Sequence, residues 1–375
     1  MRNPRTLAIT VGAFIVVLGG FLFLRAPKPI IELKAETLFS IGPFDVTNTY
    51  VTSWLVIIFL VGFAYFATRR LDLVPRGVQN LFEAVLEALW NLVVNTAGEK
   101  NARRFFPVVA TIFLYVAISN WFGLLPFFTT VGTFEELEAH ENEEVHENAV
   151  VFREVGGIGV IMPNADDVKV EVAEDASLAG KEAAIRDATR DLGDGEKAGV
   201  LVPFLRSVNT DLNAPLSLAV WSAIFVEFWG ITTFGLFRYG RRFFDPGAFG
   251  QAAAALGAMV AALLRLSFSG FLDSFTRLVG VLAGLLGGFV EFVAEMARLI
   301  SFTFRLFGNI FAGEILFLVV VFLAPLGTLV VVYGLELFVG AIQAFIFAML
   351  TLVFGVIAVS APAHGGSHEG GGEHS

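Results

Sequence analysis

The sequence contains no cysteine, and only 16% of its residues are charged. Without cysteine, the chain can hold neither a disulfide framework nor a thiolate metal site. The sequence also lacks the motifs of phosphate-binding loops, serine hydrolases and zinc proteases. In contrast, 56% of the residues are hydrophobic and the mean hydropathy is +0.73. A chain of this composition is too apolar for an ordinary soluble globule, so the sequence predicts a membrane protein. The missing motifs disfavour a membrane-bound enzyme.

Long apolar runs recur along the chain and predict an all-α integral membrane protein. A helix of about 18 to 25 apolar residues can cross the hydrocarbon core of a bilayer. Six such spans are expected, the last two being long, at about 7–24, 50–68, 105–127, 214–237, 284–321 and 327–360. The first run follows basic residues and could instead be a cleaved signal peptide. No small-residue cleavage site follows it, which favours a retained anchor.

Two further apolar segments need not be full membrane spans. Residues 78–94 place two glutamates four positions apart among Leu, Val, Phe and Trp, a pattern typical of an amphipathic helix at the membrane interface. Residues 247–283 are rich in Gly, Ala and Leu but are interrupted by three charged residues. This spacing favours an interfacial or re-entrant hairpin over two full crossings.

Charge is distributed unevenly along the chain. Residues 131–200 hold 18 of the 35 acidic residues and 6 of the 25 basic ones, which gives this segment a net charge of −12. Arginines cluster instead in short loops beside the expected spans, and by the positive-inside rule these loops face the cytoplasm. The acidic segment then lies outside. We expect it to be a solvated outer domain without a further role, with proton collection or assembly contacts as alternatives.

Polar side chains inside the fifth and sixth spans indicate where the chemistry lies. Each buried charge costs about 2.5 to 3.5 kcal/mol, so charges that are kept in a span mark ion paths or paired sites. The spans carry Glu291, Glu295, Arg298, Arg305, Asn309, Glu314, Glu336 and Gln343. At about 100° per residue, Arg305 and Asn309 continue one polar face, whereas Glu314 points to the opposite flank. Polar residues therefore lie on two different sides of one arginine. This arrangement predicts two separate half-paths for an ion.

Small residues lie beside this arginine. Gly308, Ala312 and Gly313 are expected to keep the helix surface thin, which close approach of another membrane helix requires. On the next helix, Glu336 and Gln343 lie seven positions apart and share a face. Glu314 and Glu336 are expected at similar depth, where the two carboxyls could share a proton.

Four segments resemble one known family. The run ARLISFTFRLFGNIFAGEILF at 297–317 resembles the signature of subunit a of F-type ATP synthases. IQAFIFAMLT at 342–351 resembles the last-helix motif of that family, and FFPVVATIFLYVAISNWFGLLP at 105–126 resembles an earlier helix. RSVNTDLNAPLSLAV at 206–220 resembles its Asp-x-Asn element. The segments occur in the order of the family.

The resemblance implies a non-catalytic, proton-translocating subunit without cofactor or bound metal. Its partners would be the c-ring and b-type stator subunits, within the lipid bilayer and without nucleic acid. Arg305 would face the essential carboxylate of the rotating ring, which receives protons from one half-channel and releases them into the other. The other positions that the resemblance assigns to the proton path are Asn309, Glu314, Glu336, Gln343, Glu291, Asp211, Asn213 and Asn120. Gly123 lies where some relatives carry an acid, so the outer entrance is expected to be lined differently here.

The chain is then expected to divide into five parts. These are an N-terminal anchor or signal segment with a linker (1–45), spans with an interfacial helix (46–130), an acidic external insert (131–205), a proton-channel membrane domain (206–360) and a disordered tail (361–375). A bacterial plasma membrane with both termini in the cytoplasm is the expected location. The alternative function is a stand-alone secondary transporter or ion channel, in which intramembrane charges also occur.

Overall fold

A computed structural model places most of the chain. It describes residues 12, 35–69, 72, 74–125, 128, 131–137, 148–155, 158–161, 168–170, 177–193, 195–241, 243, 246–323 and 328–360. The expected first span at 7–24 (apart from residue 12) and the tail at 361–375 lie outside the described residues.

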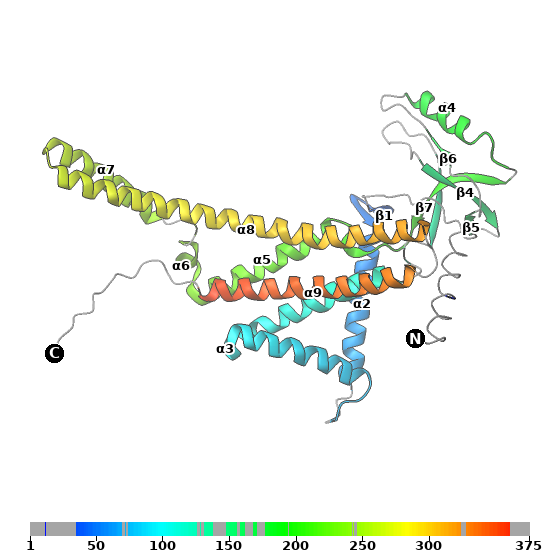
Figure 1. The fold of residues 1–375 in the computed structure, drawn as a ribbon, viewed down its shortest axis with the longest axis horizontal. Helices are drawn as coiled ribbons and strands as arrows, with labels where there is room; N and C mark the ends of the chain where they lie inside the picture. Colours follow the sequence, from blue (N-terminus) through cyan, green and yellow to red (C-terminus); the bar gives the residue numbers. More distant parts are fainter. Residues whose placement is uncertain are drawn as a thin grey trace, which may run out of the picture. The chain divides into compact units, whose positions relative to one another are not determined.

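The described part is mostly helical, as expected, and also contains small sheets that the all-α expectation did not include (Figure 1). The long helices are α2 (Asn48–Thr68), α3 (Val78–Gly123), α5 (Asn213–Phe234), α7 (Pro246–Leu264), α8 (Phe268–Leu323) and α9 (Thr328–Ser360). A short α6 (Leu236–Gly240) and the 3₁₀ turn η1 (Val208–Thr210) complete the membrane part. Among the described residues, six helices are long and apolar enough to cross a membrane, which makes this a multi-pass membrane protein.

Helix boundaries differ from expectation at two places. The expected interfacial helix and the second described span are joined in α3, which is broken at Gly98 by a backbone of φ 74° and ψ 155° that glycine adopts without steric cost. The segment expected to form a hairpin is α7 followed by the start of α8, with Ser267 N donating to the Ala262 carbonyl oxygen in the turn. Helix α8 therefore begins at Phe268 instead of near 284.

The chain folds into two compact units, each built from several stretches of sequence. Unit 1 comprises Met1–Gln79, Phe113–Ala214 and Arg305–Phe345, and unit 2 comprises Asn80–Ile112, Pro215–Phe304 and Ile346–Ser375. In unit 2, the buried Trp229 ring of α5 packs on Phe105 of α3, with ring centroids 4.2 Å apart. Gly355 of α9 leaves the room that this indole needs, because a Cβ there would lie 2.7 Å from the ring.

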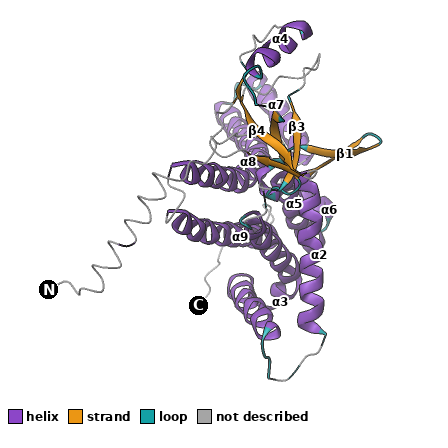
Figure 2. Ribbon diagram, turned by 90° about the vertical axis from the view of Figure 1, so that its right-hand side faces the viewer, coloured by secondary structure: helices purple, strands orange, loops and turns teal. Residues whose placement is uncertain are grey.

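The acidic insert, which belongs to unit 1, is a folded α+β domain. Its strands are β3 (Gly132–Glu136), β4 (Asn148–Val155), β5 (Ile158–Ile161), β6 (Val168–Lys169) and β7 (Glu196–Pro203), and its helix is α4 (Leu178–Ala188). The antiparallel sheet has the order β3-β7-β4-β5, with β6 paired to β4. Figure 2 shows strands in orange, with β3 and β4 labelled. Valines and alanines of β4, β6 and β7 form a core on which apolar side chains of α4 pack. The insert therefore buries a hydrophobic core of its own.

The two ends of the insert meet in the β3–β7 ladder. Gly132 pairs with Pro203 and Glu136 with Gly199, so the chain leaves and rejoins the membrane part at neighbouring points. Lys197 of β7 bonds to Glu136 and lies 3.5 Å from Glu154, and the hydrogen bond to Glu136 raises the pKa of Lys197. A short preceding hairpin of β1 (Thr37–Ile41) and β2 (Phe44–Thr47) leads into α2.

Candidate functional site

A cavity of about 310 Å³ lies inside unit 1, walled by α3, η1, α8 and α9. Most of its wall is apolar, formed by Leu, Ile, Val and Phe side chains. The polar residues that line it are Asn120, Ser207, Thr210, Glu314, Tyr333 and Glu336. Three residues expected in the proton path, Asn120, Glu314 and Glu336, thus meet at one space although they come from three helices.

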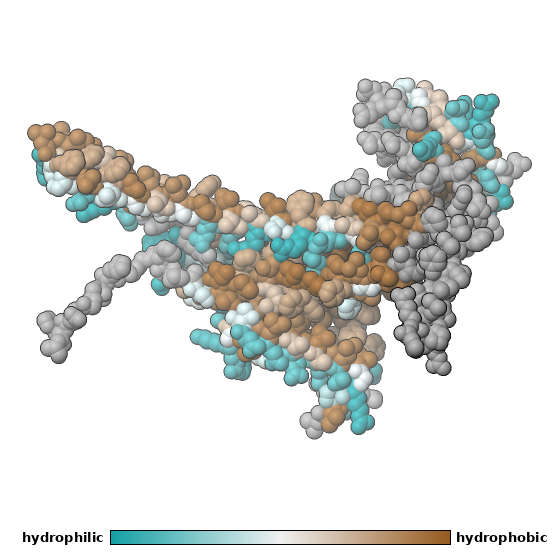
Figure 3. Space-filling view, viewed as in Figure 1, coloured by the Kyte–Doolittle hydropathy of each residue, from teal (hydrophilic) through white to brown (hydrophobic). Residues whose placement is uncertain are grey.

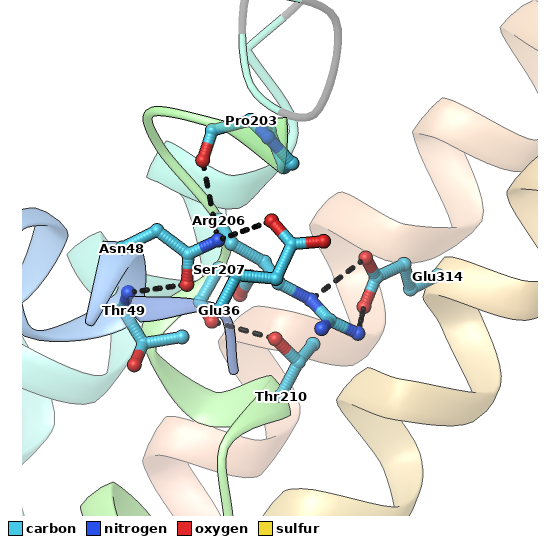
Figure 4. A network of polar contacts seen from close by, with 8 residues as sticks. All are labelled: Glu36, Asn48, Thr49, Pro203, Arg206, Ser207, Thr210 and Glu314. Atoms are coloured by element: carbon cyan, nitrogen blue, oxygen red, sulfur yellow. Dashed lines mark hydrogen bonds and ion pairs between the residues drawn. The ribbon is translucent and has the colours of Figure 1, made fainter. Parts of the chain in front are cut away.

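Glu314 is ion-paired to an arginine that the sequence did not single out. Arg206 Nε lies 3.3 Å from Glu314 Oε1, and Arg206 Nη2 lies 3.4 Å from Oε2, so the guanidinium faces both carboxylate oxygens (Figure 4). The side chains are only 7% and 19% exposed. This pair joins the segment before α5 to α8, across 108 residues of sequence.

The backbone around Arg206 is held on both sides. Before it, the Pro203 carbonyl oxygen accepts a hydrogen bond from Asn48 Nδ2 at 3.2 Å. After it, the Ser207 carbonyl oxygen accepts one from Thr210 Oγ1 at 2.7 Å, which closes the η1 turn (Figure 4). These bonds anchor a segment without long regular structure and direct the arginine side chain toward α8.

Glu336 has a different environment. It is 8% exposed, and no hydrogen bond or ion pair of its carboxyl group occurs within the described residues. Its carboxyl group packs on Gly313, where an added Cβ would lie 2.5 Å from Glu336 Cδ. Gly313 is buried and makes room for Glu336 of α9, so its small size serves close approach of another helix as expected, but away from the exposed side of α8. Gly308 and Ala312 lie on the more open side of α8.

Amide side chains connect the parts of the cavity wall that come from α3, η1 and α9. Asn120 of α3 donates from Nδ2 to the Gly340 carbonyl oxygen of α9 at 3.1 Å and accepts from Asn209 Nδ2 at 2.6 Å. Gln343 is also buried on α9 but does not line the cavity. The buried hydroxyl of Ser207 lines the cavity and has no partner among the described residues, so the cavity offers a hydrogen-bonding group to a polar guest.

Asp211 and Asn213 lie at the start of α5, away from the cavity wall. The Asp211 carboxylate accepts hydrogen bonds from the Asn213 backbone N–H and from Thr49 Oγ1, both at 3.0 Å. The first bond satisfies a backbone donor at the helix N-terminus, and the second ties α2 to this turn. The Asn213 side chain is exposed.

Arg305 lies on the outer face of α8. It and Asn309 are exposed, and within the described part of the chain Arg305 has no ion-pair or hydrogen-bond partner. Glu314 follows nine residues later and so points to the opposite side, toward the cavity. In Figure 3 hydrophilic side chains form a band along α8, between apolar surfaces.

Glu291 belongs to unit 2, on the earlier part of α8, and is half-buried. Two turns later, the Arg298 guanidinium lies 3.9 Å from Glu295 and 3.5 Å from the centre of the Phe354 ring. In this part of α8, the charged Arg298 therefore pairs with Glu295 of the same helix and packs on an aromatic ring of α9. Among the described residues, no group of three or more His, Asp or Glu side chains could hold a metal ion.

Sequence reasoning missed four polar groups of the site: Arg206, Ser207, Thr210 and Tyr333. The only available signal was for Arg206, a lone arginine between the acidic insert and an apolar helix. Its partner Glu314 could not be inferred, because only the folded chain brings the two together.

The chain resembles known proteins over most of its length. The profile of the family "ATP synthase A chain" matches residues 50–355. ATP synthase subunit a of Moorella thermoacetica is 24% identical over 86% of this chain and 95% of the relative. Shorter matches reach the subunits a of Gloeobacter violaceus (37% identity over 26% of this chain and 39% of the relative) and Trichlorobacter lovleyi (42% over 22% and 35%). From the profile match and the helical membrane fold, the chain belongs to the ATP synthase A chain family and is a subunit a, the non-catalytic, proton-translocating membrane subunit.

Proposed function

We propose that this chain forms two proton half-channels against the c-ring of an F-type ATP synthase, with Arg305 at the boundary between them. The observation that carries the proposal is the position of Arg305. It is exposed on α8 without a partner among the described residues, while Glu314 of the same helix points to the opposite side, into the cavity that Glu336 of α9 also lines.

The chemistry of the arginine supports this role. A guanidinium stays charged at every relevant pH, and a charge in an apolar helix needs compensation. A carboxylate of the ring that arrives at Arg305 would supply it, and the positive field would favour the ionised acid, so that its proton leaves. The same charge would repel protons that pass directly between the two half-channels.

The remaining residues divide between the two paths. The cavity residues Asn120, Glu314 and Glu336 form the outer half-channel, and Gln343 extends it along α9 toward the ring. Glu291 belongs to the cytoplasmic path, and Asn309 lies beside Arg305 on the ring-facing surface. Asp211 and Asn213 shape the outer entrance through the start of α5, since Asp211 holds that helix end to α2.

The partners and location follow from this role. The exposed Arg305 face meets the c-ring, and b-type stator subunits hold the chain against ring rotation. The relatives named above are bacterial proteins, and we place the chain in a bacterial plasma membrane with both termini in the cytoplasm.

Replacement of Arg305 tests the proposal. In inverted vesicles with assembly checked by blotting, Arg305→Ala should abolish ATP-driven acidification and ATP synthesis, and should permit passive proton leak. Arg305→Lys should rescue poorly, because an ammonium lacks the planar, permanently charged fork of the guanidinium. Arg103→Ala is the matched control, since Arg103 is an exposed arginine whose ion pair among the described residues is with Glu99 of its own helix. If the Arg305→Ala enzyme still pumps protons, Arg305 is structural and the proposal fails.

A further inference from the structure

Ser207 is a buried residue of the cavity wall whose hydroxyl group has no hydrogen-bond partner among the described residues. The residue is 7% exposed, and Ser207 Oγ neither donates to nor accepts from another described group. A buried hydroxyl group without a partner costs free energy, and in proteins such groups are usually bound to ordered water. The cavity that Ser207 lines, with a volume of about 310 Å³, has room for several water molecules at about 30 Å³ each.

The backbone around Ser207 fixes the place of this hydroxyl group. The Ser207 carbonyl oxygen accepts hydrogen bonds from the Thr210 backbone N–H at 3.3 Å and from Thr210 Oγ1 at 2.7 Å. Thr210 also lines the cavity, but its hydroxyl hydrogen is engaged by this backbone carbonyl (Figure 4). The two bonds close the η1 turn, so the Ser207 side chain is held at the cavity wall without a bond of its own.

A glycine of α3 makes room for the serine. A Cβ at Gly123 would lie 2.6 Å from Ser207 Cβ and 2.7 Å from Ser207 Oγ, which is closer than real side chains approach. The end of α3 and the turn before α5 therefore meet at a contact that admits no side chain at position 123. Gly123 lines the same cavity, so this contact lies at the cavity wall.

A hydroxyl group at this place is suited to the movement of protons. It can donate one hydrogen bond while it accepts another, so it can bind one water molecule on each side. It does so without a charge, unlike the carboxyl groups of Glu314 and Glu336 in the same wall, and therefore needs no counter-charge in an apolar environment. Most of the remaining wall is apolar and offers water no hydrogen bonds.

We propose that Ser207 is a relay residue, which binds water in the cavity and completes the hydrogen-bonded path between the outer water and the carboxyl groups of the cavity wall. This inference rests on the proposed function, since it assigns a role within the outer half-channel. A proton on the outer water molecule passes to Ser207 Oγ while the hydroxyl hydrogen passes to the inner water molecule. The resulting hydronium ion gives its proton to a carboxylate of the wall and is water again, and rotation of the hydroxyl group restores the starting state. During ATP-driven pumping the same steps run in reverse.

Two substitutions of the same shape isolate the hydroxyl group. Threonine keeps a hydroxyl at position 207, whereas valine replaces that hydroxyl by a methyl group of similar size, so both variants share the added bulk. In inverted vesicles that carry the complete ATP synthase, pumping is measured per assembled complex. Ser207→Thr should pump about fivefold faster than Ser207→Val, the effect of one net hydrogen bond in a rate-limiting step. Ser207→Ala, which adds no bulk, should show a similar loss relative to the wild-type enzyme.

Deuterated water provides a readout that a purely structural role would not change. If transfer past residue 207 becomes the slow step in Ser207→Val, the ratio of pumping rates in H₂O and D₂O should rise above the wild-type ratio. A variant that is slower because of altered packing should keep the wild-type ratio. Ser119→Ala is the control, because Ser119 Oγ is also buried without a partner among the described residues but Ser119 does not line the cavity. Its rate and its isotope ratio should be unchanged.

Faster pumping by Ser207→Thr than by Ser207→Val, together with a raised isotope ratio in Ser207→Val, supports the relay. Equal rates of the two variants, an unchanged isotope ratio, an equal loss in Ser119→Ala, or failure of Ser207→Ala to assemble would each show that the inference is wrong. If the two bulkier side chains prevent assembly, the rate and isotope ratio of Ser207→Ala decide in the same way. Pumping by Arg305→Ala would overturn the proposed function itself, whereas equal rates of Ser207→Thr and Ser207→Val beside an inactive Arg305→Ala overturn only this inference.

Discussion

The contact between Gly313 and Glu336 allows one acid to be displaced without changing any charge. In Gly313→Ala, the new Cβ would lie 2.5 Å from both Cδ and Oε1 of Glu336, against an ordinary contact of 3.4 Å, so the carboxyl group must move by about 1 Å. The helix itself should not suffer, because alanine in a helix interior is more stable than glycine by roughly 0.5 to 1 kcal/mol. Any loss of pumping would therefore come from the displaced carboxyl group.

The expected magnitude follows from that displacement. A misplacement of 1 Å can cost about 100-fold in a reaction step, and since a glutamate side chain can partly readjust, we expect about a tenfold slower proton entry. The assay is ATP-driven acidification of inverted vesicles, normalised to assembled complex. Gly334→Ala is the matched control on α9, because nothing lies within 4 Å of a Cβ there. If Gly313→Ala pumps at the wild-type rate with an unchanged pH profile, the position of the Glu336 carboxyl group does not control proton entry.

Two further predictions concern the acids and the insert. Glu336→Gln should slow proton translocation without abolishing assembly, and pumping rates unchanged between about pH 6 and pH 9 would contradict a proton-carrying role for this group. Replacing residues 137–198 with a short Gly/Ser linker should leave coupled ATP synthesis near normal, because Glu136 and Gly199 already face one another in the β3–β7 ladder. Loss of coupling in a fully assembled enzyme would show that the insert takes part in function.

The acidic insert has its own hydrophobic core and is attached to the membrane part at one place. Its strands and helix bury their own valines and alanines, so the domain does not depend on the membrane helices for a hydrophobic core. The pairing of its first and last strands means that the membrane part meets it at a single point of entry and exit. A domain attached in this way can be gained or lost with little change to the helices on either side.

What the sequence determined by itself rests on local physics. Apolar runs long enough to cross a bilayer appear directly in composition, and five of the six expected spans coincide with described helices. The opposite orientations of Arg305 and Glu314 follow from their separation of nine residues on one helix, since helical periodicity is fixed by backbone geometry. The clustering of acidic residues is likewise a property of the sequence alone.

Tertiary structure decided the pairings between distant segments. Arg206 and Glu314 are 108 residues apart, and no periodicity relates a coil before α5 to a face of α8. The same is true of Gly313, whose small size serves the carboxyl group of Glu336 on the next helix, and of Asp211, whose carboxylate binds Thr49 of α2. Such contacts depend on how helices pack side by side, and that packing depends on the side chains of all of them together. The sequence therefore identified two glutamates, and only the folded chain shows that Glu314 pairs with Arg206 whereas Glu336 packs on Gly313.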